Sequence, residues 1–240
     1  MRRRRRRVRF GHRVVNTWEI AHARRALLRW WRGMNRRLPW RGAKTSNYKR
    51  IVSEVLLQRT RAETVAAYWH TFFNRYPTWQ ALAKASVLDI ERTLRPIGLS
   101  RQRAPRLRRL AVALARNGGR FPSDRNAIAE LPGVGQYVAN AIMLFCHGSP
   151  YPLVDVNMAR VLERAFGHRL LADIRDDPFL QGLATEFVRH RRAKAVNWAT
   201  LDLAAIVCKP RNPRCGACPL AGTCRYARSA GRGSCRLACG

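Results

Sequence analysis

Acidic residues are scarce in this 240-residue chain, in which 14 Asp and Glu side chains stand against 47 Lys and Arg side chains. The formal net charge of +33 would destabilise a compact state through self-repulsion unless a polyanion neutralised it. A nucleic-acid backbone is the partner that we expect, because each neutralised phosphate also releases counterions. An arginine-rich source proteome would explain part of the excess of base, but it would not explain the scarcity of acid.

Long apolar runs are also lacking. None approaches the roughly 20 residues that a membrane-spanning helix needs, so we expect no membrane partner. The six arginines Arg2–Arg7 are not followed by the apolar segment and small-residue cleavage site of a secretion signal. We therefore expect residues 1–17 to form a disordered basic arm and the protein to stay in the cytoplasm, associated with the nucleoid. The alternative for the arm is a solvated tail without a function.

Cysteine is nearly absent before residue 208, where the one exception, Cys146, lies in an apolar helical run and is expected in the core. Four thiolates within 17 residues can hold a Zn²⁺ ion or a [4Fe–4S] cluster, and zinc usually prefers two symmetric C-x2-C pairs. Disulfides are disfavoured in a cytoplasmic protein. Cys235 and Cys239 lie outside the motif and have no predicted role. The motif is Cys208-x6-Cys215-x2-Cys218-x5-Cys224.

Apolar residues recur at helical spacing along most of the chain, and no segment alternates convincingly as a strand would. Proline, glycine and aspartate separate the helical segments, as at Pro39 and Pro77. We therefore predict an all-α fold. The predicted helices cover residues 18–34, 48–76, 79–84, 87–95, 101–117, 124–130, 136–147, 157–166, 178–191 and 196–206.

The segment Leu131–Asn140 predicts a helix end, a Gly-x-Gly turn and a new helix. Glycine lets the backbone turn sharply and approach a ligand, and the following helix N-terminus suits a phosphate. We expect Gly133, Val134, Gly135 and Gln136 to form a sequence-independent clamp on a DNA phosphate. The alternative is an ordinary tight turn between two helices.

The apolar run Pro152–Val154 leads to Asp155 at the start of a predicted helix. A carboxylate held in this way can serve the cleavage of an N-glycosidic bond. That reaction develops positive charge on the sugar, and a carboxylate beside the sugar stabilises the charge and activates water. The alternative is that Asp155 or Asn157 merely caps the helix, which such residues often do.

Together, these three elements resemble the endonuclease III superfamily of helix-hairpin-helix (HhH-GPD) DNA glycosylases. The resemblance runs from about Ala23 to Tyr226, and the 6-2-5 cysteine spacing matches the [4Fe–4S] loop of that superfamily. The segments Leu38–Arg41 and Ser53–Thr60 are similar to the adenine (MutY-type) and mismatch-specific thymine branches. The segment Ile97–Ala104 is particularly similar to the thymine branch.

The resemblance implies roles for individual residues. Asp155 matches the catalytic aspartate and Asn157 the residue that braces it. Tyr137 stands where strand-cleaving members carry a lysine, and a phenol forms no Schiff base, so we expect a monofunctional enzyme that uses water. Glu54 matches a second carboxylate that protonates the leaving base or its ordered water, the alternative being a surface acid of a helix.

Further residues are implied in DNA binding. Gln58 and Arg59 match the segment that enters the duplex, where Arg59 would fill the hole left by the flipped nucleotide. An ordinary basic surface residue is the alternative for Arg59. Lys209, Arg211 and Arg214, which lie between the first two cysteines, are expected to touch phosphates.

We therefore predict a monomeric two-lobed fold for double-stranded DNA with a mismatched or damaged base. Residues 48–147 form the lobe with the hairpin, and 18–47 with 148–226 form the lobe with the cluster, followed by a tail over 227–240. A cleft between the lobes would take the extruded base, thymine or uracil opposite guanine. The alternatives are adenine or another damaged base, although the lesion-reading C-terminal domain of adenine glycosylases is absent, and a non-catalytic DNA-binding protein.

Overall fold

The computed structural model describes residues 7–34 and 36–234 and divides the chain into two compact units. Unit 1 combines Met1–Met34 with Pro150–Gly240, and unit 2 covers Asn35–Ser149. Residues 35–47, which we expected in the lobe with the cluster, therefore belong to unit 2. The predicted arm residues Arg2–Arg6, as well as Cys235 and Cys239, lie outside the described residues.

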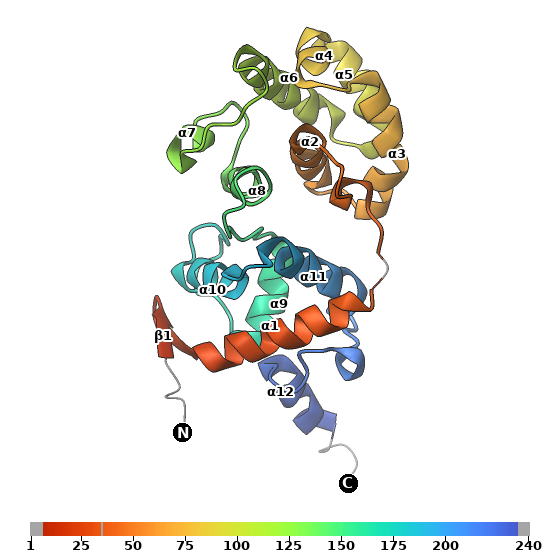
Figure 1. Cartoon of the computed structure of the whole chain (residues 1–240). Helices are drawn as coiled ribbons and strands as arrows, with labels where there is room; N and C mark the ends of the chain where they lie inside the picture. Colours follow the sequence, from red (N-terminus) through yellow and green to blue (C-terminus); the bar gives the residue numbers. More distant parts are fainter. Residues whose placement is uncertain (1–6, 35, 235–240) are drawn as a thin grey trace. The chain divides into compact units, whose positions relative to one another are not determined.

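Unit 1 is built around four helices whose apolar faces meet in one core. In Figure 1 the first helix, α1, lies beside α11 from the C-terminal part of the chain; α1 and α11 both pack with α10, and α11 and α10 pack with α9. Ile20, Leu162, Phe179, Phe187 and Leu203 are fully or almost fully buried there. The elements are β1 (Arg7–Phe10), β2 (Arg13–Asn16), α1 (Thr17–Arg32), α9 (Val156–Phe166), α10 (Pro178–Val188), α11 (Ala193–Ile206), the 3-10 helix η3 (Cys215–Ala217) and α12 (Arg225–Ser234).

The regular elements in the described part of unit 2 are all helices, joined by turns and loops. Helix α2 packs against α8, and α4 and α5 pack against α6. An aromatic cluster around Phe72 and Phe73 fills the core beneath α3. The elements are η1 (Pro39–Arg41), α2 (Asn47–Leu57), α3 (Ala62–Arg75), α4 (Trp79–Lys84), α5 (Val87–Leu94), η2 (Arg95–Ile97), α6 (Ser100–Arg116), α7 (Arg125–Ala129) and α8 (Gln136–Cys146).

Most helices begin and end within three residues of the predicted positions, but the segment 48–76 is not one helix. The chain leaves the helical conformation at Gln58, and Arg59 adopts a left-handed φ of +59° before α3 begins. A non-glycine residue in this conformation ends a right-handed helix. The prediction of a continuous helix is wrong at this point.

Residues 7–16 form a β-hairpin, where the sequence analysis expected a disordered arm. Strand β1 pairs antiparallel with β2, and Gly11 makes the turn with a φ of +52°. Phe10 and Val15 are buried in the core of unit 1, so the hairpin has an apolar face that the surrounding arginines obscure in the sequence. The helix α12 likewise continues to Ser234, eight residues into the predicted tail over 227–240.

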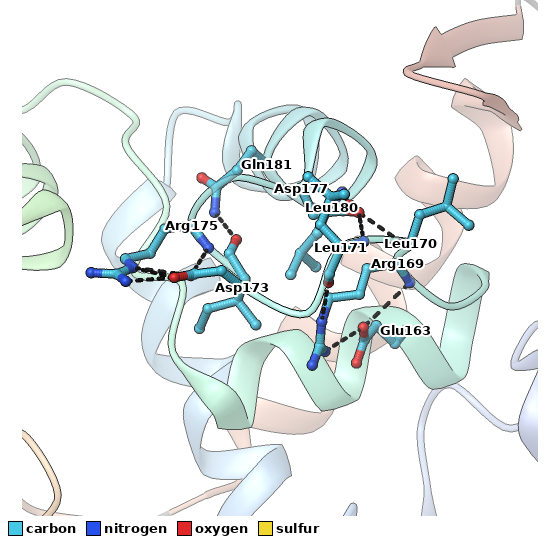
Figure 2. A network of polar contacts seen from close by, with 10 residues as sticks. Glu163, Arg169, Leu170, Leu171, Asp173, Arg175, Asp177, Leu180 and Gln181 are labelled. Atoms are coloured by element: carbon cyan, nitrogen blue, oxygen red, sulfur yellow. Dashed lines mark hydrogen bonds and ion pairs between the residues drawn. The ribbon is translucent and has the colours of Figure 1, made fainter.

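A network of polar contacts holds the connection between α9 and α10, and the buried carboxylate of Asp177 bonds both of its ends (Figure 2). Asp177 caps α10 by accepting the N–H of Leu180 at 2.7 Å, and its other oxygen accepts the N–H groups of Leu170 and Leu171 at 2.8 and 3.0 Å. Burial alone raises the pKa of Asp177, but these N–H donors and the charge of His12 bring the pKa below its ordinary value. The loop is therefore fixed even though the Leu170 and Leu171 side chains are exposed.

None of the helices in the described part of the chain has the length and apolar content that crossing a bilayer requires.

Candidate active site

The predicted phosphate clamp lies between α7 and α8 in unit 2. Gly133 has a φ of +76°, a conformation that other residues rarely adopt, so glycine suits the turn. Gly135 caps α8 without a side chain, and Gly133, Gly135 and Gln136 are exposed. Val134 differs from the other three, because its side chain is buried and anchors the turn.

The clamp is braced from two sides. Arg106 of α6 donates from Nη2 to the carbonyl of Gly133 at 3.2 Å. Arg125 of α7 donates to the Asn140 side chain in α8 at 3.3 Å. An exposed backbone turn held in this way presents its N–H groups and the start of α8 in a fixed arrangement, which suits a phosphate and needs no particular base sequence.

Glu54 and Tyr137 meet inside unit 2 because α2 packs against α8. The Tyr137 hydroxyl donates to Glu54 Oε2 at 2.9 Å. Glu54 is 3% exposed, which excludes the alternative of a surface acid. A buried carboxylate hydrogen-bonded to a half-buried phenol can transfer a proton through that phenol or accept one from it.

Asp155 is both a helix cap and a fixed carboxylate of unit 1. Its Oδ1 accepts the N–H groups of Asn157 and Met158 at 3.0 and 2.8 Å, and its Oδ2 accepts from Asn157 Nδ2 at 2.7 Å. The capping alternative is thus correct as geometry, and it leaves the half-buried carboxylate in one orientation. Val156, the next residue, is 68% exposed, so the start of α9 is accessible from solvent.

A chain of hydrogen bonds links Asp155 to the cysteine segment. Asn157 Oδ1 accepts from Arg160 Nη2 at 3.1 Å, and Arg160 Nε donates to the carbonyl of Cys208 at 2.9 Å. Arg160 also donates to the carbonyl of Ala204 in α11 at 3.2 Å. Burial lowers the pKa of Arg160. The orientation of Asn157, and with it that of Asp155, therefore depends on the backbone at Cys208.

The four cysteines of the motif lie close to one another around η3. Burial is the largest of the causes that raise the pKa of the Cys218 thiol to about 11, and the other three cysteines raise it as well. Arg164 donates to Cys208 Sγ at 3.4 Å, while Cys224 Sγ donates to the carbonyl of Arg164 at 3.3 Å. Within the described ranges, no three His, Cys, Asp or Glu side chains converge tightly enough to hold a single metal ion.

This arrangement fits an iron–sulfur cluster. Four thiols of one short segment act on one another's charge, and soft thiolate sulfur is the usual ligand of such a cluster. The guanidinium groups of Arg160 and Arg164 lie beside the segment and offset negative charge on the sulfurs. Of the predicted phosphate contacts in this segment, Arg211 and Arg214 are exposed and Lys209 is half-buried.

The turn that carries Gln58 and Arg59 is held by a residue that the sequence analysis did not single out. Arg103 of α6 donates from Nη2 to the Gln58 carbonyl and to Thr60 Oγ1, the latter at 2.6 Å. Arg59 is exposed and Gln58 is half-buried. The segment Ile97–Ala104 contains Arg103, but nothing in its pattern distinguishes a buried arginine from the many exposed ones.

Comparison with known proteins identifies both units. Residues 52–173 match the model of the HhH-GPD superfamily base excision DNA repair protein, and residues 208–224 match the iron–sulfur binding domain of endonuclease III. The second match begins at Cys208 and ends at Cys224, and it confirms the prediction of a cluster. The helix-hairpin-helix fold is confirmed as well.

Individual relatives cover nearly the whole chain. A thymine-DNA glycosylase of Aeropyrum pernix is 38% identical over 212 residues, which are 86% of this chain and 95% of the relative. An adenine DNA glycosylase of Mycobacterium tuberculosis is 38% identical over 196 residues, which are 81% of this chain and 64% of the relative. The solved structure of a thermostable thymine-DNA glycosylase has a TM-score of 0.78 and 32% identity, and the match covers 88% of this chain and 98% of that one.

Proposed function

Because this chain belongs to the HhH-GPD superfamily of base excision DNA repair proteins, we propose that it excises thymine or uracil mispaired with guanine. It is a DNA glycosylase, and its partner is DNA. The relatives named as thymine or thymine/uracil glycosylases support the choice of base. The observation that carries the reaction type is the phenol of Tyr137 at the start of α8. It is hydrogen-bonded to the buried Glu54, and it stands where an amine would be needed for a Schiff base.

Asp155 stabilises the positive charge that develops on the sugar as the glycosidic bond breaks. Its carboxylate is already oriented by two backbone N–H groups and by Asn157, so little reorganisation accompanies the reaction. The same carboxylate accepts a proton from the water that attacks the anomeric carbon. The products are a free base and an intact strand with an abasic site.

Glu54 and Tyr137 act on the departing base. As the bond breaks, the base gains negative charge, which a proton from Glu54 neutralises, while the Tyr137 hydroxyl holds the Glu54 carboxyl in place. Tyr137 has no amine with which to attack the sugar, so it forms no Schiff base with the DNA and the strand is not cut.

The [4Fe–4S] cluster would be held by Cys208, Cys215, Cys218 and Cys224. When bound, it supplies structural cross-linking of the C-terminal segment rather than a reacting group. Arg211 and Arg214, exposed in the loop between the first two cysteines, then contact phosphates on either strand.

The substrate is a duplex rather than a single strand, since the clamp at Gly133–Gln136 and the cysteine loop suit backbone contacts on double-stranded DNA. We further propose that the protein acts as a monomer on chromosomal DNA in the nucleoid. The net charge of +33 supports strong, salt-dependent binding to DNA of any sequence, on which base selection is superimposed.

A second candidate substrate is adenine opposite guanine or an oxidised guanine, and the identity of 38% to an adenine glycosylase favours it. The residues of the reaction are the same in this candidate, so base selection is the point that must be measured. A protein that binds DNA without catalysis is disfavoured by the oriented carboxylate of Asp155.

Single-turnover excision from a panel of matched duplexes tests the proposal. The panel pairs thymine or uracil with guanine, and adenine with guanine or 8-oxoguanine, and abasic sites are revealed by alkali. We expect the thymine and uracil duplexes to react fastest, with strands intact until alkali is added. Faster release of adenine would support the second candidate, and release of no base would refute both.

A further inference from the structure

Arg103 is an arginine that the structure buries without a carboxylate partner among the described residues. It comes from the first turn of α6 and is 4% exposed. Burial lowers its pKa, and the charge of Arg59 lowers it further. Taking a guanidinium out of water is costly, so it persists only where its hydrogen bonds offset the loss of hydration. Its Nε is buried and has no hydrogen-bond partner, so the offset comes from the two Nη groups.

Those two groups join two separate turns of unit 2. Nη1 donates to the carbonyls of Ile97 and Gly98 at 3.2 and 2.8 Å. Nη2 donates to the Gln58 carbonyl and to Thr60 Oγ1. The Thr60 hydroxyl in turn donates to the Ile97 carbonyl at 3.3 Å, so the two turns are linked twice.

Both turns contain residues in strained conformations. Arg59 has a φ of +59° in the first turn, and Leu99 has a φ of +52° in the second, next to Gly98 at +78°. A non-glycine residue in this region persists only where the surrounding structure holds it. The guanidinium of Arg103 contacts a residue on each side of Arg59 and the residue immediately before Leu99.

The hydrogen bonds that join the two turns require an arginine. Its planar fork presents donors in two fixed directions, and these match the carbonyl pair of the 97–98 turn and the two acceptors of the 58–60 turn. A lysine has a single nitrogen, which cannot reach both sets of acceptors with this geometry. These bonds fix the exposed residue Arg59, because Arg103 bonds both of its neighbours, Gln58 and Thr60.

We propose that Arg103 is a positioning residue for base flipping, which holds the Arg59 turn in the conformation that enters the DNA duplex. The proposal rests on the proposed function, since it concerns the same nucleotide. Flipping costs a few kcal/mol of unstacking unless a side chain replaces the lost contacts. If the turn relaxed, Arg59 would have to become ordered as the base leaves the duplex, and a smaller fraction of bases would be extruded at equilibrium.

The test compares Arg103→Met with Arg24→Met as the matched control. Arg24 also donates to three backbone carbonyls, those of Glu186, Phe187 and Arg189, and burial also lowers its pKa. It belongs to unit 1, whereas both turns belong to unit 2. Both variants lose several hydrogen bonds to backbone carbonyls and are expected to melt at lower temperature, so thermal stability alone does not distinguish them.

The readout is extrusion of the mispaired base, measured by the fluorescence of a purine analogue placed beside the mismatch, with full-length protein. We expect Arg103→Met to lower the extrusion equilibrium about tenfold, the scale of a lost hydrogen bond to a charged group. Arg24→Met should leave the equilibrium unchanged. Thr60→Val removes one acceptor of Arg103 and the bond from Thr60 to the Ile97 carbonyl, and it should act in the same direction, which keeps the test available if Arg103→Met does not fold.

A double-mutant cycle with Arg59→Ala separates positioning from general stability. If Arg103 acts through Arg59, its loss should matter little once Arg59 is gone, so the two effects should not add. Additive losses, or an Arg24→Met effect equal to that of Arg103→Met, would overturn the proposal. So would a wild-type protein that extrudes no base. A wild type that extrudes a base without excising it would refute the proposed function and leave the positioning test intact.

Discussion

Replacement of Asp155 by asparagine separates the carboxylate's chemistry from its role as a helix cap. Asparagine caps helices about as well as aspartate, so its oxygen should keep the two bonds from the N–H groups of Asn157 and Met158. The amide NH₂ then occupies the place of Oδ2 and faces Asn157 Nδ2, where the wild type has a bond of 2.7 Å. Two donors meet at that point.

Asn157 cannot resolve this conflict at no cost. Turning its amide would bring its NH₂ toward Arg160 Nη2, which now donates to Asn157 Oδ1 at 3.1 Å. We therefore expect Asp155→Asn to lose one buried hydrogen bond, which lowers the free energy of unfolding by about 1–3 kcal/mol. Loss of the negative charge should slow base release by roughly 100-fold or more, the scale for a preorganised electrostatic group.

The assay is single-turnover base release from a uracil–guanine duplex, run beside mismatch binding and thermal unfolding. Asp124→Asn is the control, because Asp124 also caps a helix by accepting a backbone N–H, that of Ala127 at 2.8 Å. It should retain the wild-type rate. Asp155→Asn that binds the mismatch and still releases base at nearly the wild-type rate would falsify the catalytic assignment.

Four further outcomes follow from the same structure. Wild type should yield no borohydride-trapped adduct, whereas Tyr137→Lys should form some, because it places an amine where the phenol now donates to Glu54; a trapped adduct with wild type would contradict the monofunctional assignment. Cys218→Ser should lose iron and solubility before it loses specific activity, and an iron content equal to wild type would exclude Cys218 as a ligand. Deletion of Arg2–Arg7 should reduce the salt dependence of DNA binding by up to roughly 0.9 in log–log slope per lost phosphate contact, and an unchanged slope would make the arm a bystander. Asp177 has a folded pKa below its ordinary value, so its contribution to stability is present above the unfolded pKa of about 3.9 and is lost as pH falls through the folded pKa. Asp177→Ala should therefore lower the melting temperature at neutral pH. The difference from wild type should be smaller at pH near 3.

Much of the fold and of the candidate site could be predicted from local features of the sequence. Helix ends were predictable where proline, glycine or a capping side chain marks them, as at Asp177 before α10 and Gly135 before α8. The roles of Glu54 and Tyr137 came from the family resemblance, and the structure adds the reason that they belong together. They are 83 positions apart and become neighbours only through the packing of α2 on α8.

Features that depend on tertiary contacts did not show in the sequence. The hairpin over residues 7–16 is stable because Phe10 and Val15 find a core in α10 and its neighbours, and two apolar residues among arginines give no such signal. The turn after Leu57 contacts Arg103, which stands 45 positions from Gln58 and bonds the Gln58 carbonyl. A contact at that separation leaves no signal in the local sequence.

The two interpretations of Asp155 illustrate why residue-level alternatives in a sequence need not exclude each other. Electrostatic stabilisation is effective only when the charged group is already in place before the reaction begins. A helix cap provides that condition, because the two backbone N–H donors fix one oxygen and Asn157 fixes the other. The bonds that first argued for a structural role therefore also support the proposed chemical role.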